Sequence, residues 1–332
     1  MVASIDTALP CAGESGRQPR RLEFPGCLEV RLTRAEVEQY EGHIEFWDAR
    51  TGLAMVAEPP TALAHELPAQ RLAKLATLIA AARGSPIEML GATDLLQLAG
   101  DGKWRRIMQP DQIVYLNPGE HTPPGSRIKV GEDRLPDVVL EVDNTTDVRR
   151  GKLYIYESWG FPELWVEVPD KPARSRPKSL RPGLTIHTLE RRRLVEAPVS
   201  RAFPGWTAGE IHRAMNEPAL SEETVAALRR VGRRMGAAAG TGPDDDPFLD
   251  AERRESRSEG RAEGHAEGHA EGRAEVLHGA LQQIFATRGI SVSWTSPNIW
   301  PIEIERAPVE RLMQAALECR NEDDFLKRLR AG

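Results

Sequence analysis

The stretch LPDVVLEVDNTTDVRRGKLYIYESWGFPELWVEVPD, from Leu135 to Asp170, predicts a strand, a helix and a second strand. Apolar and acidic residues alternate at its start, with the period of a strand that buries one face. One face is predicted to hold Val138, Leu140 and Val142, and the other Asp137, Val139, Glu141 and Asp143. Acids on one strand face repel one another unless a divalent cation, a Lys or an Arg lies between them. The alternation therefore predicts a charged site on one face of a core strand.

The middle of the stretch predicts a helix that carries a cation. Residues 144–146 are Asn, Thr and Thr, which suit a helix N-cap, and Gly160 ends the helix. At ~1.5 Å of rise per residue, Lys152 is expected about two turns inside and able to lean back towards the acidic strand face. The strand at 163–168 follows, so the unit resembles a crossover. The packed face of the helix is predicted to include Val148, Tyr156 and Trp159.

A longer ordered series of motifs surrounds this crossover. In chain order it comprises Pro110-Asp111, Pro136-Asp137 with Glu141-Val142, Lys152 with Tyr156, and Gly160-Phe161-Pro162-Glu163-Leu164-Trp165. The series resembles the Uma-two family of bacterial endonucleases, a branch of the PD-(D/E)XK nuclease superfamily. The resemblance implies an α/β, restriction-endonuclease-like mixed sheet flanked by helices, and this chain adds a helical C-terminal extension.

The resemblance also implies metal-dependent cleavage of DNA. It places metal ligands for Mg²⁺ or Mn²⁺ at Asp111 and Glu141 and the catalytic cation at Lys152. Such a metal would polarise a phosphate and activate a water, which needs hard oxygen ligands. In the superfamily, the lysine usually comes two residues after the glutamate, and this chain has Asp143 at that position. In the resembled family the lysine lies on the helix, as Lys152 does here. Asp143 is therefore interpreted either as an extra metal ligand or as a sign of altered metal use.

Four further residues are candidates for the same site. Glu45 and His65 stand at family positions, although a hairpin Glu is usually exposed and a His before a helix usually caps or packs. Asp137 shares the strand face with Glu141, but a Pro-Asp pair also simply begins strands. Tyr156 is expected to pack, with its hydroxyl at the rim of the site.

Any contact with DNA would have to come from a local basic surface, because the net charge is −6. Residues 171–193 are the one strongly basic stretch, and an exposed hairpin without a binding role is the alternative. His265 and His269 have the i, i+4 spacing of a metal pair, but Arg261 and Arg273 occupy equivalent repeat positions, which favours a solvated face. The expected phosphate contacts are Arg174, Arg176, Lys178 and Arg181.

Composition divides the chain into four parts. Residues 1–28 lack periodicity and predict a disordered leader, and 29–216 form the nuclease-like domain. Residues 217–248 predict a helix and an acidic Gly/Pro linker. Residues 249–332 predict a helical region whose EGxA repeat, Glu259–Ala274, forms a solvated helix or a loosely paired coil. Association into a homo-oligomer, or spacing, is the expected role of that region.

Local patterns also predict elements within the nuclease-like domain. They are a capped helix after Thr33, strands over 43–48 and 53–57, a helix with Pro68 in its first turn, strands over 87–116, a loop over 117–134 and a hairpin over 184–196.

The three cysteines are odd in number and widely spaced, which favours reduced thiols and a cytoplasmic protein. No apolar run approaches the ~18 residues of a membrane span. Two functions remain open from the sequence: a DNA endonuclease, and a nuclease-like scaffold without catalysis that binds nucleic acid or protein and assembles through its helical tail.

Overall fold

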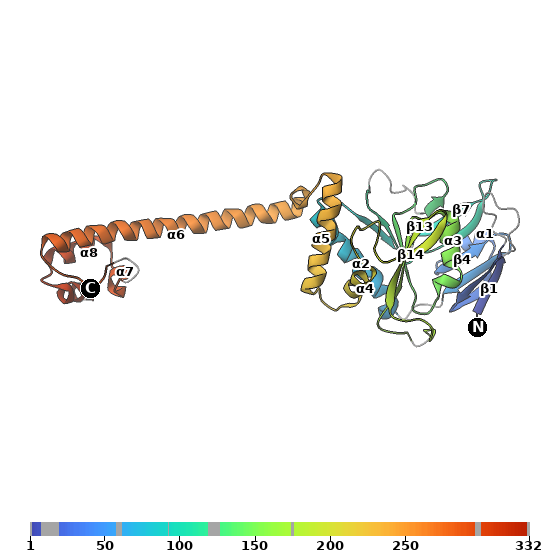
Figure 1. The fold of residues 1–332 in the computed structure, drawn as a ribbon, viewed down its shortest axis with the longest axis horizontal. Coiled ribbons are helices and arrows are strands. Elements are labelled where there is room, and N and C mark those ends of the chain that lie inside the picture. The colour runs from blue at the N-terminus through green and yellow to red at the C-terminus, as the bar shows by residue number, and fades with distance from the viewer. Residues whose placement is uncertain are drawn as a thin grey trace. The chain divides into compact units, whose positions relative to one another are not determined.

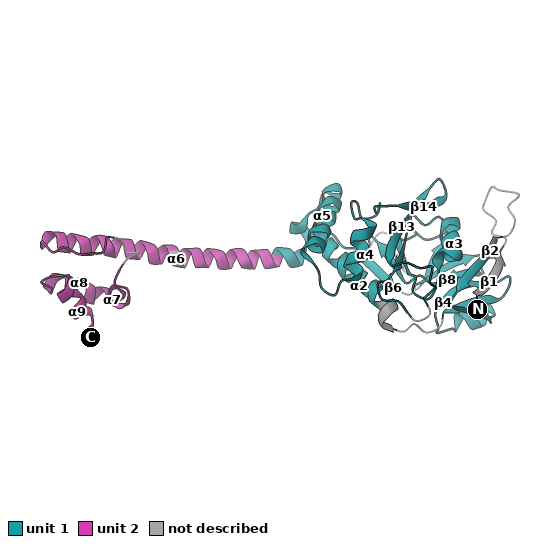
Figure 2. Ribbon diagram, turned by 60° about the horizontal axis from the view of Figure 1, so that its bottom comes forward, with its two compact units in different colours: residues 1–250 teal, residues 251–332 magenta. Residues whose placement is uncertain are grey.

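The described part of the chain is mixed α/β and has two compact units, residues 1–250 and 251–332 (Figure 2). The first unit contains two mixed six-stranded sheets with covering helices, and the second is helical (Figure 1). Within the described ranges, no helix is both long and apolar enough to cross a membrane. The α/β class with a helical C-terminal region is therefore confirmed. The computed structural model describes residues 2–7, 20–57, 62–91, 93–118, 127–173, 176–295 and 300–330.

One sheet carries the predicted crossover, in the strand order β14–β13–β12–β11–β9–β6. Strands β11 and β12 are parallel, with Leu140 opposite Trp165, and the 3-10 turn η1 (Val148–Arg150) and helix α3 (Lys152–Trp159) lie between them. The predicted strand, helix and strand are therefore confirmed. The strands are β6 (Glu88–Gly91), β9 (Gln112–Tyr115), β11 (Val138–Val142), β12 (Glu163–Val168), β13 (Gly183–Glu190) and β14 (Arg193–Ala197).

The helix of the crossover begins later than predicted. Gly151, with φ −145° and ψ −72°, separates η1 from α3. Lys152 is consequently the first residue of α3, and the prediction that it lies two turns inside the helix is wrong. Gly160 ends α3 in the left-handed conformation at φ 81°, as predicted.

The second sheet has the order β10–β7–β8–β4–β5–β3. Its β4 and β5 are the predicted strand pair, and Thr33 with Glu36 forms the predicted capping box before α1 (Arg34–Glu38). Strand β10 lies inside the segment expected to be a loop and pairs with the distant β7, a pairing that leaves little local signal. The strands are β3 (Cys27–Arg31), β4 (Ile44–Asp48), β5 (Leu53–Ala57), β7 (Asp94–Leu98), β8 (Trp104–Met108) and β10 (Arg127–Val130).

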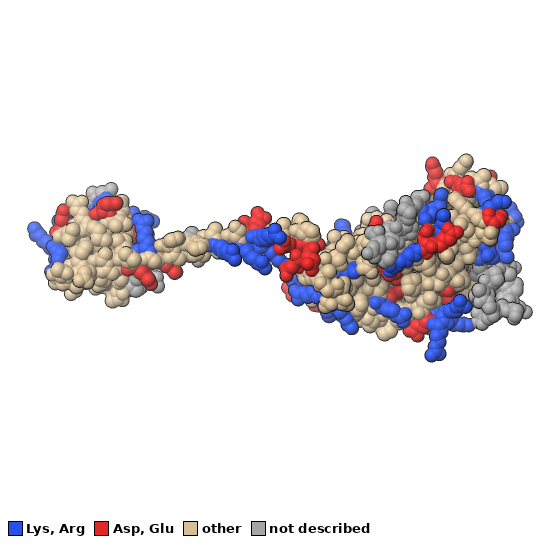
Figure 3. All heavy atoms as spheres, turned by 90° about the horizontal axis from the view of Figure 1, so that it is seen from above, with Lys and Arg blue, Asp and Glu red and all other residues tan. Residues whose placement is uncertain are grey.

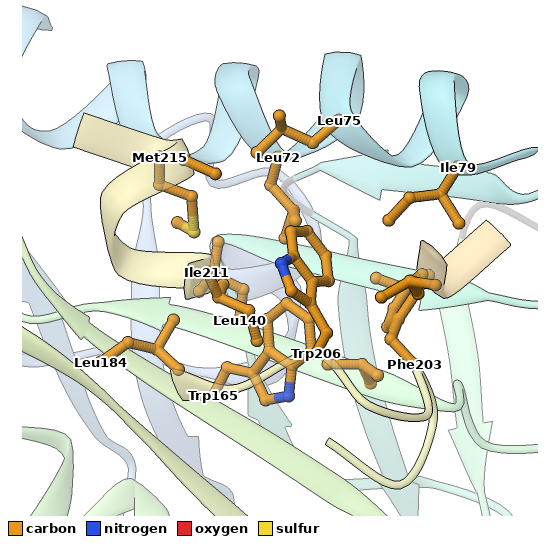
Figure 4. Close-up of a cluster of buried hydrophobic side chains, with 14 of the residues drawn as sticks. Leu72, Leu75, Ile79, Leu140, Trp165, Leu184, Phe203, Trp206, Ile211 and Met215 are labelled. Atoms are coloured by element: carbon orange, nitrogen blue, oxygen red, sulfur yellow. The ribbon is translucent and has the colours of Figure 1, made fainter. Parts of the chain in front are cut away.

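Helices α2 (Ala62–Arg83) and α4 (Ala208–Asn216) pack on one face of the crossover sheet (Figure 4). The predicted alternation in β11 is confirmed. Leu140 packs in the core under α2 and α4, whereas Val139 packs in a separate core on the opposite face of the sheet. The prediction that Pro68 lies in the first turn is wrong, since α2 begins at Ala62. The core between sheet and helices includes Leu72, Leu75, Ile79, Leu140, Trp165, Phe203, Trp206, Ile211 and Met215.

Helix α5 (Glu222–Ala239) belongs to the first unit. It packs on α2 so closely that a Cβ built at Gly232 would lie 2.6 Å from the Cβ of Ala82. Leu228 and Val231 are buried in the core just described. The helix predicted within residues 217–248 is therefore present as α5, and the short η2 (Pro243–Asp245) lies between α5 and the next helix.

The N-terminal residues also differ from the expected disordered leader over 1–28. Strand β1 (Val2–Thr7) pairs with β2 (Arg20–Pro25) in antiparallel fashion. Leu22 and Phe24 are 1% and 4% exposed, so β2 contributes to the core of the first unit. Residues 8–19 of the leader lie outside the described residues.

The predicted hairpin is formed by β13 and β14 and closes through an unusual two-residue turn. Arg191 and Arg192 have φ values of 46° and 66°. Two-residue hairpin turns with both φ values positive normally use Asn-Gly or Gly-Gly, because other L residues in this region lose roughly 1–2 kcal/mol each. The turn therefore has arginines at two positions where the backbone favours other residues.

The second unit is built from helices. Helix α6 (Pro247–Thr287) contains the EGxA repeat as a single helix, and Gly289 follows it at φ 66°. His265 is exposed on α6, as the solvated-face interpretation predicted. The small core of the unit includes Phe285, Trp294 and Phe325. The other helices are α7 (Ile302–Arg306), α8 (Val309–Glu318) and α9 (Glu322–Arg330).

Candidate functional site

Polar groups from both sheets meet around the ammonium group of Lys152. Its Nζ lies 2.6 Å from Oε2 of Glu45 and 2.7 Å from both carboxylate oxygens of Glu141. It also donates a hydrogen bond of 2.8 Å to the carbonyl oxygen of Gln109. The hydroxyl of Tyr156 donates a further hydrogen bond to Glu141. Glu45, Glu141, Lys152 and Tyr156 therefore form one cluster, which we call the Lys152 cluster.

Local backbone geometry directs these side chains to one place. Lys152 and Tyr156 are four residues apart on α3 and therefore share a helix face. Strand β4 has a bulge between Ile44 and Phe46, and bulges re-aim side chains next to functional sites. With this bulge, Phe46 lies in the core beside the cluster while Ile44 lies in another core, and Glu45 between them reaches Lys152. The sequence alone gives no sign of the bulge.

The cluster is almost completely closed to solvent. Glu45, Glu141 and Lys152 are 5%, 3% and 3% exposed. Burial alone would lower the pKa of Lys152, but the charges of Glu141 and Glu45 outweigh it and the pKa is raised. Lys152 therefore remains an ammonium ion, whose charge both carboxylates need in a buried environment.

The two glutamates respond to this environment in opposite directions. Burial raises the pKa of Glu141, and Asp111 and Glu45 raise it further, so that it exceeds the ordinary value despite Lys152. Burial would also raise the pKa of Glu45, but the charge of Lys152 and the nearby imidazole of His43 outweigh it and the pKa is lowered. Glu45 is therefore the more firmly ionised carboxylate, and Glu141 accepts a proton more readily.

His43 is a member of the site that the sequence did not single out. Its Nε2 lies 3.1 Å from Oε1 of Glu45, on the side away from Lys152. Burial would lower the pKa of His43, but the close contact with the charge of Glu45 outweighs it and raises the pKa. The only sequence signal was the His-Ile-Glu order at the start of the strand. His43 therefore supports the ionised form of Glu45.

Asp111 lies next to the Lys152 cluster without joining its hydrogen bonds to Lys152. Its Oδ2 accepts a hydrogen bond of 2.6 Å from the backbone N–H of Val142. Its charge raises the pKa of both Glu141 and Lys152, which places it within electrostatic reach of them. The structure therefore brings together Asp111, Glu141 and Lys152, the three residues predicted as catalytic.

Asp143 lies apart from this cluster. It is 0% exposed, and its two carboxylate oxygens accept hydrogen bonds of 3.0 and 3.1 Å from the N–H of Val148. The largest charge effects on its pKa come from Asp147 and Arg149, which lie outside the Lys152 cluster. Burial raises the pKa of Asp143 to about 7. These contacts give Asp143 a structural role in the turn before α3 and do not favour the extra metal ligand.

Asp137 also has a local structural role. It accepts a hydrogen bond of 2.8 Å from the N–H of Leu116 and pairs with Arg134 at 3.1 Å. These contacts anchor the start of β11, in line with the alternative that a Pro-Asp pair begins strands. The side chain of His65 lies outside the described residues.

Comparisons of the chain with protein-family models, curated proteins and solved structures gave no match.

The predicted phosphate contacts are only partly available for a ligand. Arg176 donates hydrogen bonds to Asn144 Oδ1 and to the carbonyl oxygens of Pro169 and Lys171. Lys178 and Arg181 are exposed, and Arg174 lies outside the described residues. On the face drawn in Figure 3, Lys and Arg are interspersed with Asp and Glu over the first unit.

Carboxylate oxygens, the ligand type that Mg²⁺ prefers, gather beside Lys152. Asp111, Glu45 and Glu141 bring three carboxylates into one buried region, and Lys152 neutralises only one of them. Among the described residues, no three His, Cys, Asp or Glu side chains are arranged as a metal site. Mg²⁺ does not require such a cage, because it usually keeps several waters and binds one or two protein carboxylates. Asp111 and Glu141 are therefore the residues that could hold such a cation.

Phe24 of β2 and Cys27 of β3 lie against one side of the Lys152 cluster. The space beside Lys152 and Glu45 is about 10 Å³, which is room for one water at most, and Phe24 and Cys27 line it. Phe24 stacks on Phe46 with ring centroids 5.4 Å apart. Burial raises the pKa of the Cys27 thiol, and the charge of Glu45 raises it further. A substrate that approached Lys152 and Glu45 from this side would therefore need β2 to move.

Gly151 offers a direct test of this cover. A Cβ there would lie 2.7 Å from the backbone oxygen of Glu23, so Gly151→Ala is expected to displace β2. We expect a loss of about 1–3 kcal/mol in the free energy of unfolding and faster reaction of Cys27 with a thiol reagent, measured in a Cys11→Ser background. The control is Gly209→Ala, because a Cβ at Gly209 meets nothing within 4 Å. An unchanged thiol reaction rate in Gly151→Ala would contradict the tight fit of β2.

Proposed function

We propose that this chain is a metal-dependent endonuclease that hydrolyses DNA phosphodiester bonds, with the restriction-endonuclease-like fold of the Uma-two family. The observation that carries the proposal is the convergence of Glu141 and Lys152, from one crossover, with Asp111 next to them. Asp111 adjoins the sheet strand β9, which pairs directly with β11. Carboxylates on neighbouring strands with a lysine nearby are the groups that this chemistry requires.

Each residue has a defined role in the proposed site. Asp111 and Glu141 would hold Mg²⁺ or Mn²⁺, which when bound lowers the pKa of a water and neutralises phosphate charge. Lys152 supplies a fixed positive charge next to Glu141, and Tyr156 orients the carboxylate of Glu141 through its hydroxyl. Glu45, with His43, keeps Lys152 charged and in place. A cytoplasmic location and association through the second unit belong to the same proposal.

The decisive experiment is nicking of supercoiled plasmid with Mg²⁺ or Mn²⁺. Glu141→Gln and Lys152→Met are each expected to lower the nicking rate on the order of 10²-fold or more, because each removes a charge that the reaction uses. The matched controls are Glu132→Gln and Lys129→Gln, an exposed pair whose charges lie 3.6 Å apart outside the site. Both controls are expected to nick at the parent rate.

Equal nicking by the parent and all four variants would show that the activity has another source. The absence of nicking by the parent, with DNA still bound, would favour the second candidate function, a binding scaffold without catalysis. The observation that favours this candidate is that Lys152 joins both glutamates under the cover of β2. Binding and nicking are therefore measured on the same samples.

A further inference from the structure

The tip of the β13–β14 hairpin presents three consecutive arginines to solvent. Arg191, Arg192 and Arg193 are all exposed, and Arg191 and Arg192 form the turn itself. Both turn residues have positive φ, a conformation in which residues with a Cβ are disfavoured. Backbone strain of this kind concentrates at functional positions, and here it displays two guanidinium groups at the most projecting point of the hairpin.

The basic character continues from the hairpin tip across a neighbouring loop. Arg201 lies 3.2 Å from Glu190 at the base of the turn, and its side chain is 62% exposed. The loop that starts at Arg201 reaches Gly205, whose carbonyl oxygen accepts a hydrogen bond of 3.1 Å from Arg230 on α5. The Arg234 guanidinium also lies against Gly205. These contacts join the hairpin to the loop and the loop to α5.

We propose that this surface binds the phosphate backbone of duplex DNA. The residues that form it, which we call the arginine surface, are Arg191, Arg192, Arg193, Arg201, Arg230 and Arg234. Planar guanidinium groups match phosphate oxygens through paired hydrogen bonds. Among the described residues, Glu190 and Glu210 form ion pairs with arginines of this surface, which leaves six arginines against two paired acids.

A duplex fits this surface better than a single strand. Proteins that bind single strands stack bases on exposed aromatic rings. Phe203 and Trp206, the aromatic residues of the loop, are both 0% exposed and pack in the core. The surface therefore offers charge without stacking, which suits contacts to the backbone of a double helix. The choice of DNA as the polyanion rests on the proposed function.

The turn geometry provides a variant that removes charge without harming the fold. The double substitution Arg191→Asn with Arg192→Gly removes two guanidinium groups and installs the residue pair that this turn favours. We expect a thermal midpoint at least as high as that of the parent. The matched control is Lys103→Gln with Lys129→Gln, which removes two exposed charges from the other sheet of the same unit.

Binding of a fluorescent duplex is measured by anisotropy with the full chain in EDTA, so that cleavage plays no part. The turn variant is expected to bind about tenfold or more weakly at low salt, and the slope of log K against log salt is expected to fall by about two. The control variant is expected to match the parent. Parent-like affinity and slope in the turn variant would overturn the proposal, as would equal weakening in the control.

Competition identifies the class of partner. Unlabelled duplex is expected to compete better than single-stranded DNA or polyglutamate, and equal competition by polyglutamate would assign the surface to an acidic protein instead. If the turn variant loses duplex binding but the parent does not nick plasmid, this inference stands and the nuclease proposal fails. If the parent nicks plasmid but the turn variant binds duplex like the parent, the nuclease proposal stands and this inference fails.

Discussion

Replacing Lys152 with methionine is expected to lower the free energy of unfolding by about 3–5 kcal/mol, because it leaves Glu45 and Glu141 buried without a countercharge. Methionine keeps most of the volume of the side chain, so the loss reports charge more than packing. The measurement is urea unfolding of the parent and Lys152→Met in EDTA. Glu141, whose pKa is already raised, can take up a proton in the variant. The expected loss is therefore smaller than that for two buried, unpaired charges.

A compensated variant separates the charge effect from other consequences of the substitution. Glu45→Gln and Glu141→Gln added to Lys152→Met remove all three charges, and we expect most of the lost stability to return. Breaking a buried ion pair is strongly destabilising, whereas replacing the whole group with neutral residues is often nearly neutral. A triple variant no more stable than Lys152→Met would contradict the assignment of the loss to buried, unpaired carboxylates.

Asp143→Asn is expected to stabilise the protein at neutral and alkaline pH. Burial raises the pKa of Asp143 from 3.8 to about 7, so the folded state binds its proton more tightly than the unfolded state does. Between pH ~4 and ~7 the folded parent binds more protons at Asp143 than the unfolded chain does. The free energy of unfolding of the parent therefore falls as the pH rises through this range. At ~1.4 kcal/mol per pH unit, the full effect is about 4 kcal/mol.

The predicted signature is a gain that depends on pH. We expect Asp143→Asn to exceed the parent by about 2–4 kcal/mol at pH 8, and by much less at pH 5, where Asp143 is mostly protonated. The asparagine oxygen can still accept the hydrogen bond from the N–H of Val148. The check is urea unfolding at both pH values in EDTA. A uniform gain, or a loss at pH 8, would contradict the raised pKa and restore Asp143 as a charged residue.

The sequence predicted the central strand and its charged face because this information is local. Alternation in β11 separates Leu140 from Glu141, and the order of motifs selected Asp111, Glu141 and Lys152 before their proximity was known. The i, i+4 spacing likewise links Lys152 with Tyr156. These features depend on residue periods that do not change with tertiary context.

Other parts of the site depend on distant contacts that the sequence does not display. The break at Gly151, which shifts Lys152 to the start of α3, occurs where β2 packs against the backbone. The bulge that directs Glu45 arises from the pairing of β4 with β5. Strand β2 itself looked like part of a disordered leader, because strand formation depends on partners more than on composition. The raised pKa of Asp143 likewise results from burial, which the sequence does not display.

The EGxA repeat in α6 has a consequence for how this chain can change in length. One four-residue unit added to or removed from an α-helix changes its length by about 6 Å and turns everything beyond it by about 40°. The described side chains between Glu259 and His265 are all exposed on α6, so such a change would disturb no buried side chain among them. Whole-unit insertions and deletions would therefore change the length of α6 in fixed steps without disturbing the buried core of the second unit.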